Sequence, residues 1–68
     1  MTVLVNGEPY QTAAGVTVIA LLGELGHDPG GGGIAVAVNG EVVPRGAWPT
    51  TALGERDRIE VLGAAQGG

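Results

Sequence analysis

The last six residues of the sequence, GAAQGG, end in the α-carboxyl of Gly68. Among the groups of this chain, we consider this carboxyl the first candidate for a chemical reaction. This carboxyl is ionised at neutral pH, since its reference pKa is about 3.3 to 3.7, and it reacts only after activation. Adenylation with ATP would give a mixed anhydride, and a sulfur nucleophile could then leave a thiocarboxylate on Gly68. Residues without a Cβ at this end would pass through a narrow channel. We therefore expect an arm to enter a partner's active site, made of Gly63, Ala64, Ala65, Gln66 and Gly67.

The side chains offer no competing catalytic apparatus. The chain has no serine and no cysteine, and its one histidine, His27, stands where a cation suits the end of a predicted helix. The seven carboxylates are scattered over turns and strand faces rather than paired. The glycine run at 30 to 33 leads into a strand, whereas a phosphate loop leads into a helix. We predict no catalytic side chain, no metal site and no stably bound cofactor.

Length and composition describe one small acidic domain. The 68 residues include 44% hydrophobic ones, but the only aromatic residues are Tyr10 and Trp48. With no cysteine, no disulfide can support the fold, so the core must be aliphatic. The formal charge of -4 disfavours nucleic acid and anionic membranes as partners. No leader peptide or apolar run of spanning length is present, so we expect a cytoplasmic protein.

The elements that must position the arm begin with two predicted hairpins. Alternating apolar residues predict a strand at 1–5, and Asn6-Gly7 is the strongest short signal for a type I′ turn into a returning strand at 8–12. The same tetrapeptide, VNGE, recurs at 38–41. It predicts a second hairpin, from a strand at 34–38 through Asn39-Gly40 into the segment EVVPR.

One helix is predicted between the hairpins. Thr17 can cap its start and Gly26 can end it. Ala20 stands where a capping box would have glutamate or glutamine, so packing must hold this helix. Its apolar stripe follows the spacing i, i+3, i+4 and i+7, in Val18, Leu21, Leu22 and Leu25. After the second hairpin comes an irregular connection, in which we expect Trp48 to be a core anchor rather than a ligand platform.

Two prolines indicate the strand order. Pro9 and Pro44 lie in the two returning strands, and proline lacks the N–H that a central strand donates, so both strands are predicted at edges. The last strand, 58–62, then inserts centrally to give the order 2-1-5-3-4. This is an α+β fold, the ubiquitin-like β-grasp, with a mixed sheet of about five strands and one helix across a face, although a barrel also tolerates the pattern. We predict a domain at 1–62 and a flexible tail at 63–68.

The sequence resembles the ThiS-type sulfur carriers of thiamine biosynthesis along its whole length. The resemblance rests on NGE at 6–8, TVIALLGELG at 17–26, IAVAVNGEVVPR at 34–45 followed by Trp48, DRIEVL at 57–62, and the terminal Gly-Gly. Two positions depart from the family pattern. Ala20 replaces a residue that is often acidic, and Arg56 stands where glycine commonly precedes the aspartate of the last turn.

This resemblance implies a carrier rather than an enzyme. A ubiquitin-activating-like adenylyltransferase of the ThiF type would use ATP to adenylate Gly68. A cysteine desulfurase or another donor would supply sulfur, and the thiocarboxylate would pass it to a thiazole synthase of the ThiG type.

Two other functions remain open from the sequence. One is a sulfur carrier of a different pathway, such as the small subunit of molybdopterin synthase or a carrier for sulfur amino-acid synthesis, which would share the same tail chemistry. The other is a ubiquitin-like interaction or modifier domain that works through its sheet face. The absence of lysine disfavours chains built on the protein itself, but it permits single conjugation.

Overall fold

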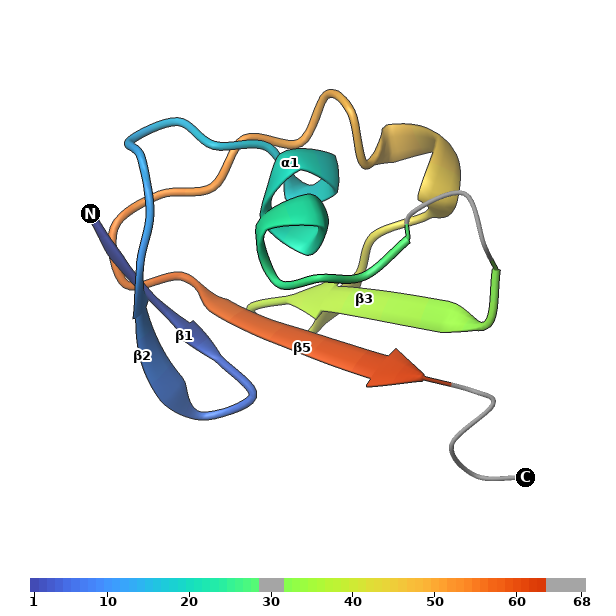
Figure 1. The fold of residues 1–68 in the computed structure, drawn as a ribbon, viewed down its shortest axis with the longest axis horizontal. Coiled ribbons are helices and arrows are strands. Elements are labelled where there is room, and N and C mark those ends of the chain that lie inside the picture. The colour runs from blue at the N-terminus through green and yellow to red at the C-terminus, as the bar shows by residue number, and fades with distance from the viewer. Residues whose placement is uncertain (29–31, 64–68) are drawn as a thin grey trace.

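The computed structural model describes residues 1–28 and 32–63. Five strands form one sheet in the order β2-β1-β5-β3-β4, and helix α1 lies across one face (Figure 1). Strands β1 and β5 are parallel, and the other neighbours are antiparallel. The elements are β1 (Thr2–Val5), β2 (Glu8–Gln11), α1 (Val18–Glu24), β3 (Ile34–Val38), β4 (Glu41–Val42), a short 3-10 helix η1 (Arg45–Ala47) and β5 (Arg58–Gly63). The predicted order and the single helix are confirmed.

Both Asn-Gly turns have the backbone that the sequence predicts. Asn6 and Gly7 have φ values of 50° and 86°, and Asn39 and Gly40 have 51° and 86°. Positive φ at both central positions defines a type I′ turn, whose twist matches that of the flanking strands. The repeated tetrapeptide therefore closes two hairpins, and the pairing of Val5 with Glu8 and of Val38 with Glu41 follows directly.

Helix α1 begins and ends through local hydrogen bonds. The hydroxyl of Thr17 accepts from the N–H of Ala20 at 3.3 Å, which satisfies one of the free donors of the first turn. At the other end the N–H of His27 donates to the carbonyl of Leu22 at 3.0 Å, while Gly26 has φ 87°. This is a Schellman ending, which needs a residue that tolerates positive φ. The predicted cap and stop are confirmed.

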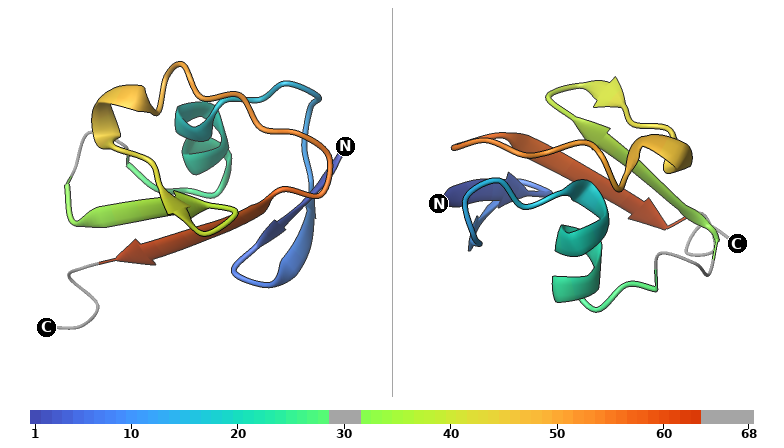
Figure 2. Two further views of the ribbon diagram at one scale, coloured as in Figure 1. Left: turned by 180° about the vertical axis from the view of Figure 1, so that it is seen from behind. Right: turned by 90° about the horizontal axis from the view of Figure 1, so that it is seen from above.

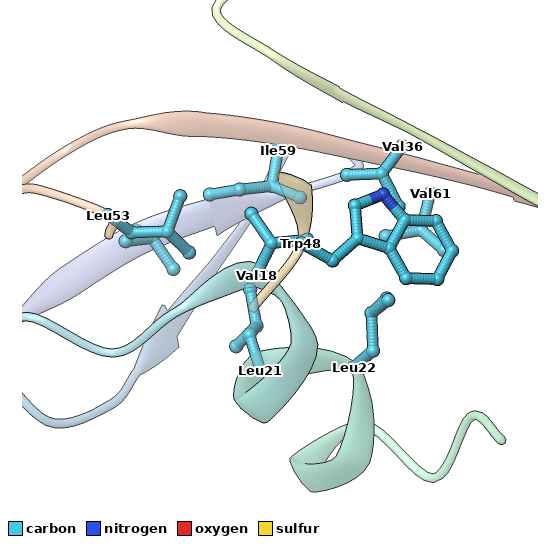
Figure 3. Close-up of a cluster of buried hydrophobic side chains, with 9 residues drawn as sticks. Val18, Leu21, Leu22, Val36, Trp48, Leu53, Ile59 and Val61 are labelled. Carbon is cyan, nitrogen blue, oxygen red and sulfur yellow. The ribbon is translucent and has the colours of Figure 1, made fainter. Parts of the chain in front are cut away.

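Trp48 is the largest side chain of a core that lies between α1 and the sheet. Its indole is 2% exposed, and Figure 3 shows it among Val36, Val61 and Leu22. The indole N–H donates to the carbonyl of Val43 at 2.9 Å, so burial leaves no donor unpaired. Trp48 is therefore the core anchor that the sequence predicts. The buried residues are Val3, Val18, Leu21, Leu22, Val36, Trp48, Leu53, Ile59 and Val61.

The second returning strand is shorter than predicted. The residue pattern predicts a returning strand over residues 41–45 that includes Pro44, but β4 ends at Val42. The N–H of Val43 donates to Val36 at 2.8 Å, and Pro44 then precedes η1 with φ -60° and ψ 146°. Because proline has no N–H to donate, the ladder stops before it. Strand β4 is at the edge as expected, but Pro44 starts a 3-10 turn and is not a strand residue.

The connection from η1 to β5 runs beside the start of α1 (Figure 2). The N–H of Val18 donates to Thr51 at 2.9 Å, and the N–H of Leu53 donates to Val16 at 2.8 Å. These bonds hold the segment over the core. The buried side chain of Leu53 covers one end of the core. No helix in the described ranges is long and apolar enough to cross a membrane.

Candidate functional site: the base of the C-terminal arm

Strand β5 leads to the predicted reactive end and is the central strand of the sheet. It pairs with β3 from Ile59 to Gly63 and with β1 at Arg58 and Ile59. Its inward residues Ile59 and Val61 are 1% and 7% exposed, so the strand is anchored in the core. Central position and burial make β5 a rigid base for the residues that follow it.

The strand runs one residue further than predicted. Gly63, assigned from sequence to the tail, is the last residue of β5 and lies opposite Ile34 in the sheet. The alternation of apolar side chains could not show this, because glycine has no side chain to place on a face. The other predicted arm residues, Ala64, Ala65, Gln66, Gly67 and Gly68, lie outside the described part of the chain.

Asn6 does more than form its turn. Its side-chain oxygen accepts from the N–H of Val61 at 2.9 Å, and its side-chain nitrogen donates to the carbonyl of Val61 at 3.3 Å. The Asn6 backbone N–H donates to Ile59 at 2.8 Å. The amide side chain thus takes the place of a further strand residue beside β5.

Asn39 holds β5 from the other side and near its start. Its side-chain oxygen accepts from the N–H of Arg58 at 2.9 Å, and its own N–H donates to the carbonyl of Arg58 at 2.7 Å. Its side-chain nitrogen donates to the carboxylate of Asp57 at 3.0 Å. The two asparagines of the repeated VNGE therefore clamp the same strand, a role that the turn interpretation missed. Their repetition in the sequence was the signal that could have suggested it.

The turn before β5 sets the alignment of that strand with β1. The N–H of Arg56 donates to the carbonyl of Thr2 at 2.7 Å, and the N–H of Leu4 donates to Asp57 at 2.9 Å. The Asp57 carboxylate also accepts from the N–H of Gly54 at 2.7 Å. Arg56 has φ 65°, in the left-handed region. Arg56, where the resemblance implies a glycine, therefore occupies a conformation that suits glycine.

The sheet face turned away from α1 is partly apolar. Leu62 and Val42 are 67% and 76% exposed, the largest exposures among the described large hydrophobic residues. A hollow of about 270 Å³ lies nearby, lined by Leu4, Gly7, Gly40, Arg58, Ile59 and Glu60. The sequence suggests a working sheet face only for the interaction-domain alternative and does not identify its residues, although Leu4 and Leu62 stand at the outward positions of their alternations.

The titratable side chains of the described residues are exposed, except for the half-buried Tyr10 and Asp57. His27 and Asp28 are exposed beyond the end of α1. No group of three or more histidine, cysteine or acidic residues in the described ranges could hold a metal ion. The carboxylate of Glu24 accepts from the hydroxyls of Tyr10 at 3.0 Å and Thr12 at 2.9 Å. The bond to Glu24 raises the pKa of Tyr10, with smaller contributions from burial and from the Glu24 charge. This contact fastens β2 to the helix.

Comparison with known proteins gives consistent matches. The model of the ThiS family matches residues 3–68. Sulfur carrier protein ThiS of Escherichia coli is 37% identical over 68 residues, which cover both chains completely. The thiamine biosynthesis protein ThiS of Geobacter metallireducens has a crystal structure that superposes with a TM-score of 0.81 at 33% identity, covering 91% of each chain.

Two longer relatives also align with the whole chain. The thiazole synthase of Paramagnetospirillum magneticum is 38% identical over 68 residues, and this chain spans only 20% of its length. The thiazole synthase of Magnetococcus marinus is likewise spanned over 20% of its length. The family match extends through the C-terminal Gly-Gly, and the solved relative has the same fold. The resemblance and the ubiquitin-like fold predicted from sequence are thereby confirmed, and the chain belongs to the ThiS family.

Proposed function

We propose that the chain is a sulfur carrier of thiamine biosynthesis, a protein on which partner enzymes act, and not itself an enzyme. The observation that carries this proposal is the match to the ThiS family over residues 3–68, which includes Gly67 and Gly68. The full-length alignment with a protein named as a sulfur carrier supports it. The absence of cysteine means that no side chain of this protein can carry sulfur as a persulfide.

The reaction takes place at the carboxyl of Gly68. A ThiF-type adenylyltransferase uses ATP to join AMP to this carboxylate, with release of pyrophosphate. A sulfur nucleophile, supplied by a cysteine desulfurase or another donor, attacks the carbonyl carbon. The C–S bond forms and the bond to AMP breaks, so that AMP leaves. When the nucleophile is sulfide, the product is the thiocarboxylate. When it is the outer sulfur of a desulfurase persulfide, the product is an acyl disulfide, and a thiol then attacks the donor's sulfur, so that the S–S bond breaks, a new disulfide forms and the thiocarboxylate remains on Gly68. ATP binds to the partner, so this chain needs no cofactor of its own.

The position of β5 in the sheet supports insertion of the C-terminal arm into the active site of a partner. Five residues follow Gly63, and a fully extended chain spans at most about 3.3–3.6 Å per residue, so Gly68 can reach roughly 17 Å beyond the strand. The core holds Ile59 and Val61, while small or uncharged residues follow. A firm base with a slender arm lets one carboxyl enter several active sites in turn.

A ThiG-type thiazole synthase is the proposed acceptor of the sulfur. Two proteins named thiazole synthase contain a stretch that aligns with the whole of this chain, which supports a connection between carrier and synthase. We place the protein in the cytoplasm, where ATP and the sulfur donors act. Delivery of sulfur to thiazole formation, and not to a molybdopterin synthase large subunit, would separate this pathway from the related ones.

The test is the intact mass of the 68-residue chain after incubation with the ThiF-type enzyme, ATP and a sulfur donor. We expect a gain equal to the exchange of one oxygen for one sulfur, located at Gly68 by fragmentation. The matched control is the chain with one alanine added after Gly68, which displaces the carboxyl and leaves the core unchanged. Sulfur gain at the same rate in the extended chain, or no gain in the original one, would refute the proposal.

A further inference from the structure

We propose that Asn6 is a positioning residue, which fixes the direction in which the chain leaves β5 toward the reactive carboxyl. This inference rests on the proposed carrier function. It is carried by the two hydrogen bonds between the Asn6 side chain and the backbone of Val61, at 2.9 and 3.3 Å. Val61 lies two residues before Gly63, where the described strand ends.

The Asn6 side chain extends the contact between β1 and β5 beyond the point where the backbone of β1 turns away. Backbone pairing of β1 with β5 covers Leu4 with Arg58 and Val5 with Ile59. The chain then enters the turn at Asn6, which donates from its backbone to Ile59 at 2.8 Å. The Asn6 amide reaches the next residue on that side of β5, so the hold of the first hairpin extends from Ile59 to Val61.

The end of β5 depends on the bonds from Asn6 because β5 has strand partners on both sides only near its start. At Ile59 the strand is paired on both sides, whereas from Glu60 to Gly63 the strand pairing is with β3. Two-stranded ribbons twist more strongly than wider sheets. By binding both polar groups of Val61, the Asn6 amide acts as a third strand at that level and restricts the twist of the segment that ends at Gly63.

The second VNGE provides a matched control within the same chain. Asn39 has nearly the same φ as Asn6, 51° against 50°, and its side chain also binds the β5 backbone, at 2.9 Å. It acts on Arg58, at the start of the strand, and not near the arm. Glycine tolerates the left-handed backbone of a type I′ turn. Asn6→Gly and Asn39→Gly therefore preserve their turns and remove side-chain clamps from opposite ends of one strand.

The experiment measures pyrophosphate release by the ThiF-type enzyme with ATP, as a function of carrier concentration. For Asn6→Gly we expect kcat to fall roughly five- to thirtyfold, the range expected for one or two lost hydrogen bonds of average strength, with KM unchanged. Bound carriers would present the carboxyl productively less often, while the docking surface is the same. For Asn39→Gly we expect kcat to stay at the original value. Asn6→Asp retains the acceptor for Val61 N–H but not the donor, so its kcat should lie between the two.

A second measurement does not depend on the partner. Backbone ¹⁵N relaxation should show lower order at Leu62 and Gly63 in Asn6→Gly, but not in Asn39→Gly. Equal kcat and equal order in the two glycine variants would overturn the positioning role. If the original chain is not adenylated at all, the carrier function is refuted, and the relaxation comparison alone decides whether Asn6 orders the end of β5.

Discussion

Arg56 occupies a backbone conformation that costs free energy in the folded state. Its φ is 65°, and its side chain is exposed. Its N–H donates to the carbonyl of Thr2 at 2.7 Å, so the conformation is held by the contact that aligns β1 with β5. Replacing Arg56 by glycine should therefore stabilise the domain, although the change removes a whole side chain.

The magnitude follows from two opposing terms. A residue with a Cβ in the left-handed region costs about 1–2 kcal/mol, which glycine avoids. Glycine loses more conformational freedom on folding, which costs roughly 0.5–1 kcal/mol. The free energy of unfolding of Arg56→Gly should thus rise by about 0.5–1 kcal/mol. In a domain of this size 1 kcal/mol shifts Tm by roughly 4–8 °C, so the gain should be a few degrees.

Thermal unfolding followed by circular dichroism measures this change, and Arg56→Ala is the matched control. Alanine removes the same charge and the same long side chain, but its Cβ keeps the strain. We expect Tm to rise in Arg56→Gly and to stay level or fall in Arg56→Ala. An equal rise in both variants would assign the gain to lost charge, and an unchanged Tm in Arg56→Gly would refute the strain argument.

Three further predictions concern the core, the helix and one titration. Trp48→Ala should lower the free energy of unfolding by about 3–5 kcal/mol, and because a domain of this length has only roughly 3–10 kcal/mol, much of the variant should be unfolded by circular dichroism. Ala20→Glu places a carboxylate in the first turn of α1 and should raise urea stability by about 0.3–1 kcal/mol, an increase that salt reduces. The pKa of Tyr10 is raised in the folded state, first by its hydrogen bond to Glu24. This contact therefore stabilises the fold fully at pH values below the unfolded tyrosine pKa of about 10, and the stabilisation is lost as the pH rises through the folded pKa. Absorbance titration of Glu24→Gln should show the Tyr10 pKa moved back down, and an unmoved pKa would contradict this cause.

Local rules of the sequence were enough for much of the fold. The Asn6-Gly7 and Asn39-Gly40 turns have the predicted geometry because positive φ at both positions favours these residue types. Thr17 caps the helix and Gly26 ends it, since each role depends on neighbours within a few residues. The central place of the last strand followed from prolines that were expected at edges.

The candidate site was predicted from the sequence only in part. The sequence identified Gly68 as the predicted carrier of the chemistry and placed the strand before it at the centre of the sheet. It did not indicate that Gly63 belongs to β5, since a glycine has no side chain to show its face. It also placed Pro44 in a strand, because the rule that proline lies at edges does not say where the strand ends.

Sequence by itself determined the turns, the helix limits, the strand order and the family to which the chain belongs, because these depend on residue types at short, fixed spacings. Only the tertiary structure decided what the asparagines of VNGE bind. Asn6 meets Val61 across 55 positions of sequence, and Asn39 meets Arg58 across 19. Such contacts exist only once β5 has inserted between the hairpins, so a pattern read along the chain cannot contain them.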